Sequence, residues 1–483
     1  MNYKLVFYIL GKVMMFMALF LLLPCIVAVI YHEKSGIYFF IASVISILLG
    51  FLMSRKRPVN KNFFAREGFV VVALSWILMS IVGSIPFWAS GEIPNPIDAL
   101  FEIVSGFTTT GASIVPVVEN LSKCMLFWRS FSHWIGGMGV IVFIMALLPM
   151  AGANNMHLLR AESSGTNVGK LVPKMKETAG MLYIIYMAMT LIMLVVLAIS
   201  GMPLFENICI TFGTAGTGGF GLVSDSIASY TAAQQWIITI FMFLFGVNFS
   251  FYYLIILKKI RQAFKLEEVR WYIAVYLGVV ALIVINVVNT MGNVVGSTSD
   301  IIRHAAFQVS SLMTTTGYST LDYEIWPEFS KGLLLLVMFT GACAGSTAGG
   351  IKISRFIIAA KGMAKNVKQL IHPQRVKITK MDEKALSDDT IKLVNTYFLV
   401  YFAIYVVSLL VVSLDKFGFE TNFTAVAATL NNIGPGLGAA GPTESFADFG
   451  IMSKIVFIID MLIGRLEIFP ILLLFMPSTW KNK

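Results

Sequence analysis

The sequence predicts an all-α integral membrane protein in which four tandem repeats surround one pseudo-four-fold pore. Three observations lead to this fold class. The 483-residue chain has a mean hydropathy of +0.80 and only 13% charged residues, and no soluble domain of this size could bury so much apolar surface. Long apolar stretches alternate with clusters of Lys and Arg, and four short glycine loops recur at nearly regular intervals. The net charge of +10 is therefore interpreted as topology signals between spans, not as a nucleic-acid surface.

The first two apolar stretches predict a transmembrane hairpin, residues 1–54, that precedes the repeats. They cover 5–31 and 37–53, with a short polar connection between them. The first stretch lacks a clear small-residue cleavage site and a second span follows at once, so it is not interpreted as a signal peptide. The cluster Arg55-Lys56-Arg57-Pro58 then predicts a cytoplasmic connection, because positive charge is enriched on that side of a membrane.

Each repeat is expected to contain a span, a short re-entrant pore helix, a loop and a returning span. The repeats are assigned to residues 55–160, 161–260, 261–375 and 376–483. Their spans are expected near 69–90 and 126–149, 181–200 and 234–257, 271–291 and 332–357, and 392–414 and 451–476. With the hairpin these make about ten transmembrane helices, which places both termini and the Lys/Arg clusters in the cytoplasm.

Four runs fall into register on one glycine: Thr109-Thr110-Gly111-Ala112-Ser113, Thr217-Gly218-Gly219-Phe220-Gly221, Thr315-Thr316-Gly317-Tyr318-Ser319 and Asn432-Ile433-Gly434-Pro435-Gly436. The aligned glycines are 108, 98 and 117 positions apart. Such polar backbone is tolerated at membrane depth only where it is buried in protein or lines a water-filled path. A row of backbone carbonyls can replace the hydration shell of potassium, as in the filter run Thr-Val-Gly-Tyr-Gly, and glycine permits the backbone conformation that this needs. The predicted potassium ligands are the carbonyls of Thr109, Thr110, Gly111, Thr217, Gly218, Gly219, Thr315, Thr316, Gly317, Asn432, Ile433 and Gly434.

The second and fourth loops depart from the pattern of the other two. Gly218 stands where the first and third loops have Thr, and the fourth loop contains Asn432 and Pro435. We therefore expect the carbonyl geometry to differ in these two quadrants, and the selectivity to be looser than that of a symmetric filter.

A string of small residues, 341–350, interrupts the second span of the third repeat. These residues make a poor helix, and a break at membrane depth must face protein or water, so the string predicts an intramembrane gating loop. Arg465 lies near the middle of the last span, where an unpaired arginine is costly. We expect it to donate to carbonyls of the string, with Asp460 and Glu467 as the alternative partners. The predicted gate residues are Gly341, Gly345, Gly349, Gly350 and Arg465.

The other motifs do not indicate a cofactor. Residues 216–221 match G-x-G-x-x-G without a βαβ context, and the Walker spacing fails in the small-residue string because Ile351 stands before Lys352. The four cysteines and five histidines show no metal-ligand spacing, so we expect no organic cofactor in this chain. His133 is interpreted either as a proton relay or as a histidine that satisfies a neighbouring carbonyl, and we favour the second interpretation.

Taken together, these residues resemble the Trk/Ktr/HKT superfamily of cation transporters. The resemblance rests on the four loops, Ser132-His133-Trp134-Ile135-Gly136-Gly137, the broken third-repeat span and Gly464-Arg465-Leu466-Glu467, and it covers nearly the whole chain. With its extra N-terminal pair of spans, the chain is most similar to the bacterial Trk-type potassium uptake subunits. The resemblance implies a homodimer in the bacterial inner membrane, with a potassium-conducting pore in each protomer. It also implies a cytoplasmic TrkA-like regulatory subunit that binds NAD(H) or ATP/ADP, and a role of the four glycines in selecting potassium over sodium.

Two other functions remain as alternatives at this stage. A secondary transporter would couple potassium to proton or sodium movement, and Asp460 is its clearest mid-span carboxylate. A membrane enzyme would need paired carboxylates, a metal cluster or a Ser/His/Asp arrangement, none of which the sequence shows on its spans. The basic segments 258–270 and 355–384 are either plain topology signals or docking surfaces for the regulatory subunit.

Overall fold

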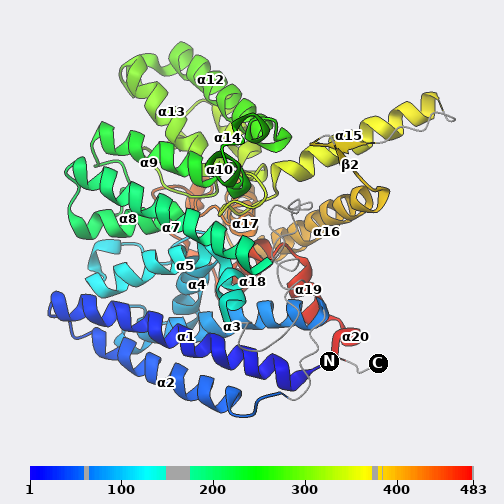
Figure 1. Ribbon diagram of the computed structural model, residues 1–483. Coiled ribbons are helices and arrows are strands. Elements are labelled where there is room, and N and C mark those ends of the chain that lie inside the picture. The colour runs from blue at the N-terminus through cyan, green and yellow to red at the C-terminus, as the bar shows by residue number, and fades with distance from the viewer. Residues whose placement is uncertain (59–64, 148–174, 373–378, 383, 481–483) are drawn as a thin grey trace.

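The computed structural model describes residues 1–58, 65–147, 175–372, 379–382 and 384–480. The predicted repeat boundaries at 160 and 375 and the C-terminal lysines lie outside the described residues. The regular structure of the described chain is almost entirely helical (Figure 1). Its strands, β1 (Lys380–Met381) and β2 (Lys384–Ala385), form one short antiparallel pair in which Lys380 lies opposite Ala385.

The predicted hairpin consists of α1 (Tyr3–Ile30) and α2 (Gly36–Ser54). The two helices approach closely at Gly11 and Gly50, because a Cβ on Gly11 would lie 2.7 Å from the Gly50 carbonyl oxygen. Small residues permit such packing between membrane helices, and Ser43 adds a hydrogen bond of 2.8 Å to the Ala18 carbonyl.

The succession of long helix, short helix and return arm occurs four times along the chain. The long helices are α3 (Ala65–Ser90), α7 (Met175–Ile199), α12 (Glu267–Val295) and α16 (Asp388–Val412). The short helices are α4 (Pro96–Phe107), α8 (Leu204–Gly216), α13 (Thr298–Met313) and α17 (Phe419–Leu430). The return arms are α5 (Lys123–Leu147), α9 (Ala232–Phe245) with α10 (Phe249–Ile256), α14 (Glu328–Phe339) with α15 (Ile353–Ile371), and α18 (Ile451–Arg465) with α19 (Phe469–Phe475). Two one-turn helices, α11 (Ile260–Ala263) and α20 (Pro477–Trp480), and short 3-10 turns at 118–120, 323–325, 438–440 and 446–448 complete the described elements.

The first, second and fourth return arms differ from the continuous spans that the sequence predicts, whereas the third is broken where the sequence predicts an interruption. Among the described residues, six helices are long and apolar enough to cross a membrane, namely α1, α2, α3, α7, α12 and α16. The return arms are broken: α5 has a left-handed residue at Gly139, α9 and α10 meet at 90°, and residues 340–352 separate α14 from α15. The fourth arm breaks where Glu467 and Ile468 take positive φ. The reason is local, since glycine, small residues or left-handed backbone stands at each break.

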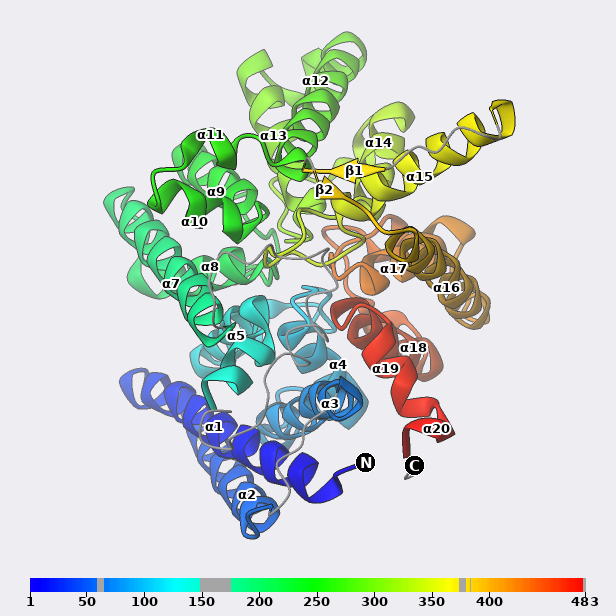
Figure 2. The ribbon, with the colours of Figure 1, turned by 45° about the vertical axis from the view of Figure 1, so that its right-hand side comes forward.

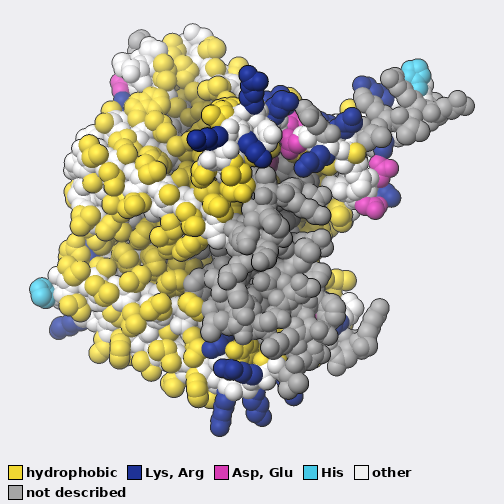
Figure 3. Space-filling view, in the orientation of Figure 1, with side chains coloured by type: hydrophobic (Ala, Val, Ile, Leu, Met, Phe, Trp, Pro, Cys, Tyr) yellow, Lys and Arg dark blue, Asp and Glu magenta, His cyan; other side chains and the backbone are white. Residues whose placement is uncertain are grey.

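The four repeats follow one another around a centre where their loops meet, and the hairpin lies outside the first repeat (Figure 2). Buried apolar side chains form one continuous core through the hairpin and all four repeats. Figure 3 shows a largely hydrophobic face, with one group of Lys and Arg side chains at the upper right and another at the lower edge. Tyr3 at the start of α1 donates to the Trp480 carbonyl at 2.6 Å, and α15 extends beyond the rest of the molecule on the same side of the view (Figure 1).

Candidate functional site

Each short helix ends where one of the four aligned loops begins. Their carboxyl-terminal caps are Thr108, Thr217, Thr314 and Asn431. At the other end of α4, the Asn95 side chain caps the helix and Pro96 occupies its first turn, where no N–H is needed. Because a helix dipole carries partial negative charge at its carboxyl end, four such ends around one centre favour a cation there.

The four loops share one backbone pattern. Their first aligned residues, Thr109, Thr217, Thr315 and Asn432, have φ values of 53°, 57°, 54° and 57°. The aligned glycines two positions later also have positive φ, at 81°, 74°, 85° and 103° in chain order. Left-handed backbone is costly for residues other than glycine, so its recurrence at non-glycine residues in all four loops marks a conformation that the fold imposes.

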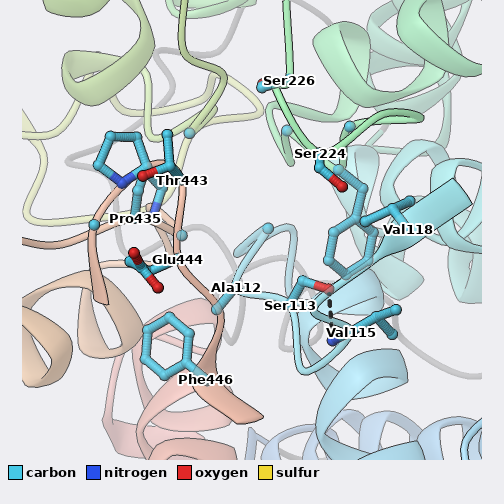
Figure 4. Close-up of a pocket in the computed structure, with 18 of the residues that line it drawn as sticks. Ala112, Ser113, Val115, Val118, Ser224, Ser226, Pro435, Thr443, Glu444 and Phe446 are labelled. Atoms are coloured by element: carbon cyan, nitrogen blue, oxygen red, sulfur yellow. Dashed lines mark hydrogen bonds between the residues drawn. The ribbon is translucent and has the colours of Figure 1, made fainter. Parts of the chain in front are cut away.

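The loops contact one another in a closed cycle. A Cβ on Gly111 would overlap the carbonyl oxygen of Gly218 in the second loop. In the same way, a Cβ on Gly219 would overlap the Thr316 carbonyl oxygen, and a Cβ on Gly317 would overlap the Ile433 carbonyl oxygen. The cycle closes at Gly434, where a Cβ would lie 2.8 Å from the Thr110 carbonyl oxygen. All four aligned glycines line one cavity, which Figure 4 shows from close by with Ser113, Ser224, Pro435 and Glu444 around it.

The first and third loops are also matched in their side chains. The Thr108 and Thr110 hydroxyls lie 2.8 Å apart, and those of Thr314 and Thr316 lie 2.7 Å apart. All four residues are buried. These hydroxyl pairs hold each loop against the end of its own short helix.

The second loop departs from this pattern for a steric reason. The imidazole of His133 fills the space beside Gly218, so a Thr side chain at this position would collide with the ring. The ring packs against Phe220, with centroids 4.3 Å apart. Both ring nitrogens are fully buried, and the interpretation of His133 as a histidine that satisfies a neighbouring carbonyl stays a prediction.

The fourth loop keeps the shared pattern with asparagines in place of threonines. The Asn432 amide donates to the Thr110 hydroxyl at 3.0 Å and to the Met461 carbonyl at 2.9 Å. Its glycine has the largest φ of the four, at 103°, and precedes Pro435. The predicted difference in carbonyl geometry between this quadrant and the others stays a prediction.

The small-residue string lies directly beneath the third loop. Its Gly349 N–H donates to the Thr315 hydroxyl at 2.7 Å. Arg465 donates to the Thr347 carbonyl at 2.8 Å and to the Gly137 carbonyl at 3.0 Å. The contact between Arg465 and the string that the sequence led us to expect is thus present, while its role as a gate stays a prediction. Arg465 also donates to the Gly136 carbonyl.

The alternative partners of Arg465 lie elsewhere. Asp460 accepts from the Ser408 hydroxyl at 2.8 Å, and Glu467 forms an ion pair with Arg355. Arg465 and Glu467 are two positions apart, a spacing that does not bring side chains face to face on a helix. The helix α18 ends at Arg465, and Glu467 beyond it has a positive φ of 55°.

Two charged residues that support the string were not predicted. Glu268 accepts from the backbone N–H groups of Ala344 at 2.7 Å and Ser354 at 3.2 Å. Lys352 donates to the Ala348 carbonyl and, at 3.3 Å, to the Gly349 carbonyl. A signal was available for Lys352, because a Lys two positions after a string of small residues at membrane depth needs acceptors.

A buried ion pair behind the first loop was also missed. Arg129 Nε lies 2.6 Å from Glu102 Oε1, and both side chains are almost fully buried. A carboxylate in a predicted pore helix and an arginine in the following span are each costly alone, so their joint presence was the signal.

Comparison with known proteins decides the family. The TrkH family model, described as a cation transport protein, matches residues 35–482. The chain belongs to the TrkH family. The Trk system potassium uptake protein TrkH of Salmonella typhimurium is 34% identical over 491 residues, which cover 100% of both chains. The protein TrkG of Escherichia coli K12 is 35% identical over 473 residues, or 96% of each chain. The crystal structure of the potassium transporter TrkH from Vibrio parahaemolyticus matches with a TM-score of 0.88 and 31% identity over 100% of both chains.

TrkH membership confirms the predicted superfamily and the all-α, multi-pass membrane fold. It places the chain among transport proteins and excludes the membrane-enzyme alternative. Within the described residues, no group of three or more His, Cys, Asp or Glu side chains could hold a metal ion.

Proposed function

We propose that this TrkH-family chain takes up potassium across the bacterial inner membrane, through a pore whose filter is formed by the backbone carbonyls of the four loops. The observation that carries the proposal is the shared left-handed pattern of four loops around one cavity. The relatives described as potassium uptake proteins support potassium as the ion. The twelve carbonyls predicted from the sequence are the ligands, and the ion sheds its water against them.

The small-residue string and Arg465 form the gate in this proposal. The string is tied to the third loop through Gly349 and Thr315 and is held from below by Arg465. A guanidinium at this place is an electrostatic barrier to a permeating cation, and glycine-rich backbone can change conformation at low cost. Gly341, Gly345, Gly349 and Gly350 supply that freedom, and Gly345 and Gly350 have positive φ.

The protein is proposed to act as a homodimer with a cytoplasmic TrkA-like subunit that binds NAD(H) or ATP/ADP. Relatives described as parts of a Trk system support a multi-subunit assembly. The side of the molecule that carries the Lys/Arg clusters, α15 and the start of α1 is assigned to the cytoplasm, by the positive-inside rule. Both termini then lie on that side.

The experiment is growth rescue of a potassium-uptake-deficient bacterium in low-potassium medium, followed by potassium flux into proteoliposomes. We expect rescue, and flux that exceeds sodium flux under matched gradients. A well-inserted protein that supports neither growth nor potassium flux, with its regulatory partner present, would exclude the proposal.

A further inference from the structure

Beyond the aligned glycines, each loop is held by a neighbouring repeat at an equivalent residue. These residues stand two positions after the glycines and are Ser113, Gly221, Ser319 and Gly436. In each case the backbone carbonyl oxygen accepts a hydrogen bond from the repeat that precedes it in the cycle.

Two of the four links are donated by backbone N–H groups. Ile227 of the second repeat donates to the Ser319 carbonyl of the third at 2.9 Å. Phe446 of the fourth repeat donates to the Ser113 carbonyl of the first, also at 2.9 Å. Both donors belong to the connections that follow the loops, so the loops and these connections interlock.

The other two links are donated by buried side chains. Arg129 Nη1 of the first repeat donates to the Gly221 carbonyl of the second at 3.3 Å. The Tyr323 hydroxyl of the third repeat donates to the Gly436 carbonyl of the fourth at 2.9 Å, and Tyr323 is 1% exposed. The four links therefore close a complete ring around the cavity.

Arg129 is itself fixed by several contacts. Glu102 accepts from its Nε, and the second oxygen of Glu102 accepts from the Ile114 N–H at 2.8 Å. Arg129 Nη2 donates to the Ser113 hydroxyl at 3.1 Å, and the guanidinium lies 4.1 Å from the centre of the Phe220 ring. The planar fork of arginine thus joins equivalent positions of the first and second loops through two separate nitrogens, a geometry that the single ammonium of lysine does not reproduce.

We infer that this ring of four hydrogen bonds sets the spacing of the loops at their outer ends, and that Arg129 and Tyr323 are positioning residues for ion selectivity. The inference rests on the proposed potassium filter. A loop that can move inward can coordinate the smaller sodium ion, whereas loops fixed at their spacing by hydrogen bonds to their neighbours disfavour it. The ring acts between repeats, whereas the Thr108–Thr110 and Thr314–Thr316 hydroxyl pairs each act within one repeat.

The test is the potassium-to-sodium permeability ratio of purified protein in proteoliposomes. Tyr323→Phe removes one hydroxyl and should lower the ratio about two- to tenfold, as expected for one hydrogen bond. Arg129→Lys keeps a charge beside Glu102 but loses the fork, and should act in the same direction. Tyr276→Phe is the matched control, because its hydroxyl donates to the Ala306 carbonyl at 3.1 Å within the third repeat.

The outcomes separate the inference from the proposed function. Wild-type protein that conducts no potassium overturns the proposed function. Potassium-selective wild-type protein with an unchanged ratio in both Tyr323→Phe and Arg129→Lys overturns the ring, as does an equal loss in Tyr276→Phe. If Arg129→Lys fails to insert, the comparison of Tyr323→Phe with Tyr276→Phe decides alone.

Discussion

At the residue scale, the loop glycines meet two separate physical demands. Each has a positive φ, which a side chain disfavours, and each faces a carbonyl oxygen of the next loop, which leaves no space for a Cβ. At Gly317 a Cβ would overlap the Ile433 carbonyl oxygen and lie 3.0 Å from Pro435 Cδ. A side chain at Gly317 would therefore displace the fourth loop as well as its own.

Substitution of these glycines should therefore change selectivity more than protein abundance. We expect Gly317→Ser and Gly111→Ser to lower the potassium-to-sodium permeability ratio in proteoliposomes. Gly332→Ser in α14 is the control, because no atom outside its own helix and chain neighbours lies within 4 Å of the added Cβ. An unchanged ratio in both loop variants would show that the filter assignment is wrong.

Arg465 is the second residue whose surroundings predict a measurable effect. It joins the small-residue string to carbonyls of α5, so its loss frees the string and removes a positive charge from the proposed path. Arg465→Ala should raise basal potassium flux and weaken its dependence on the regulatory subunit. Lys454→Ala serves as control, since Lys454 is a buried cation of the same helix that pairs with Asp98 at 2.9 Å. Equal fluxes in wild type and Arg465→Ala would place the gate elsewhere.

At the scale of elements, the sequence predicted the loops better than the return arms. The loops carry a repeated signal, Thr or Asn two positions before glycine, and the structure gives all four the same backbone pattern. The three breaks that were not predicted carry different signals: Gly139 in α5, a Gly-Val-Asn turn after α9, and no small residue at Glu467 and Ile468. A hydropathy pattern cannot reveal such breaks, because the flanking segments stay apolar.

The missed contacts of the site have a common physical cause. Glu102, Arg129 and Glu268 find their partners in other helices or in the loops, so no local spacing reports the pairing. His133 is a similar case, because it lies on α5 while its ring occupies the space beside Gly218 in the second loop, where the first and third loops have a Thr side chain. These residues could be predicted to need partners, but not which ones.

The projecting element α15 provides a test of the proposed docking surface. Lys365 pairs with Asp388 at the start of α16 at 2.6 Å, and Lys368 follows in the last turn of α15. Reversing Lys365 and Lys368 to Glu should abolish co-purification with a TrkA-like subunit and leave membrane insertion intact. Arg375, which belongs to the same basic segment 355–384, lies outside the described residues.

The internal ion pair requires its own control in that experiment. Lys365→Glu also places like charges beside Asp388, so the double variant Lys365→Glu/Asp388→Lys restores the pair with its charges exchanged. If the double variant regains the partner, the pair acts only by holding α15 against α16. Undisturbed co-purification of the Glu variants would remove these lysines from the docking surface.

At the scale of the whole molecule, the question is whether potassium moves alone or with a second ion. The four loops enclose one central cavity, whereas Asp460 lines an apolar pocket between α16 and α18 and accepts from Ser408. The other Asp460 oxygen has no hydrogen-bond partner among the described residues, which keeps coupled transport as the competing hypothesis.

The proposed pore predicts that current through the open protein reverses at the Nernst potential for potassium at every proton gradient. Asp460→Asn preserves an acceptor for Ser408 and removes the only titratable group among the described residues that line this pocket, so it should leave both the flux and the reversal potential unchanged. The measurement is electrogenic flux in proteoliposomes with potassium and pH gradients set independently, with wild type and Asp460→Asn compared side by side. A reversal potential that follows the pH gradient in wild type, and that loses this dependence in Asp460→Asn, would instead make Asp460 the coupling site of a secondary transporter. If the reversal potential is independent of the pH gradient in both proteins, potassium moves alone through the central path.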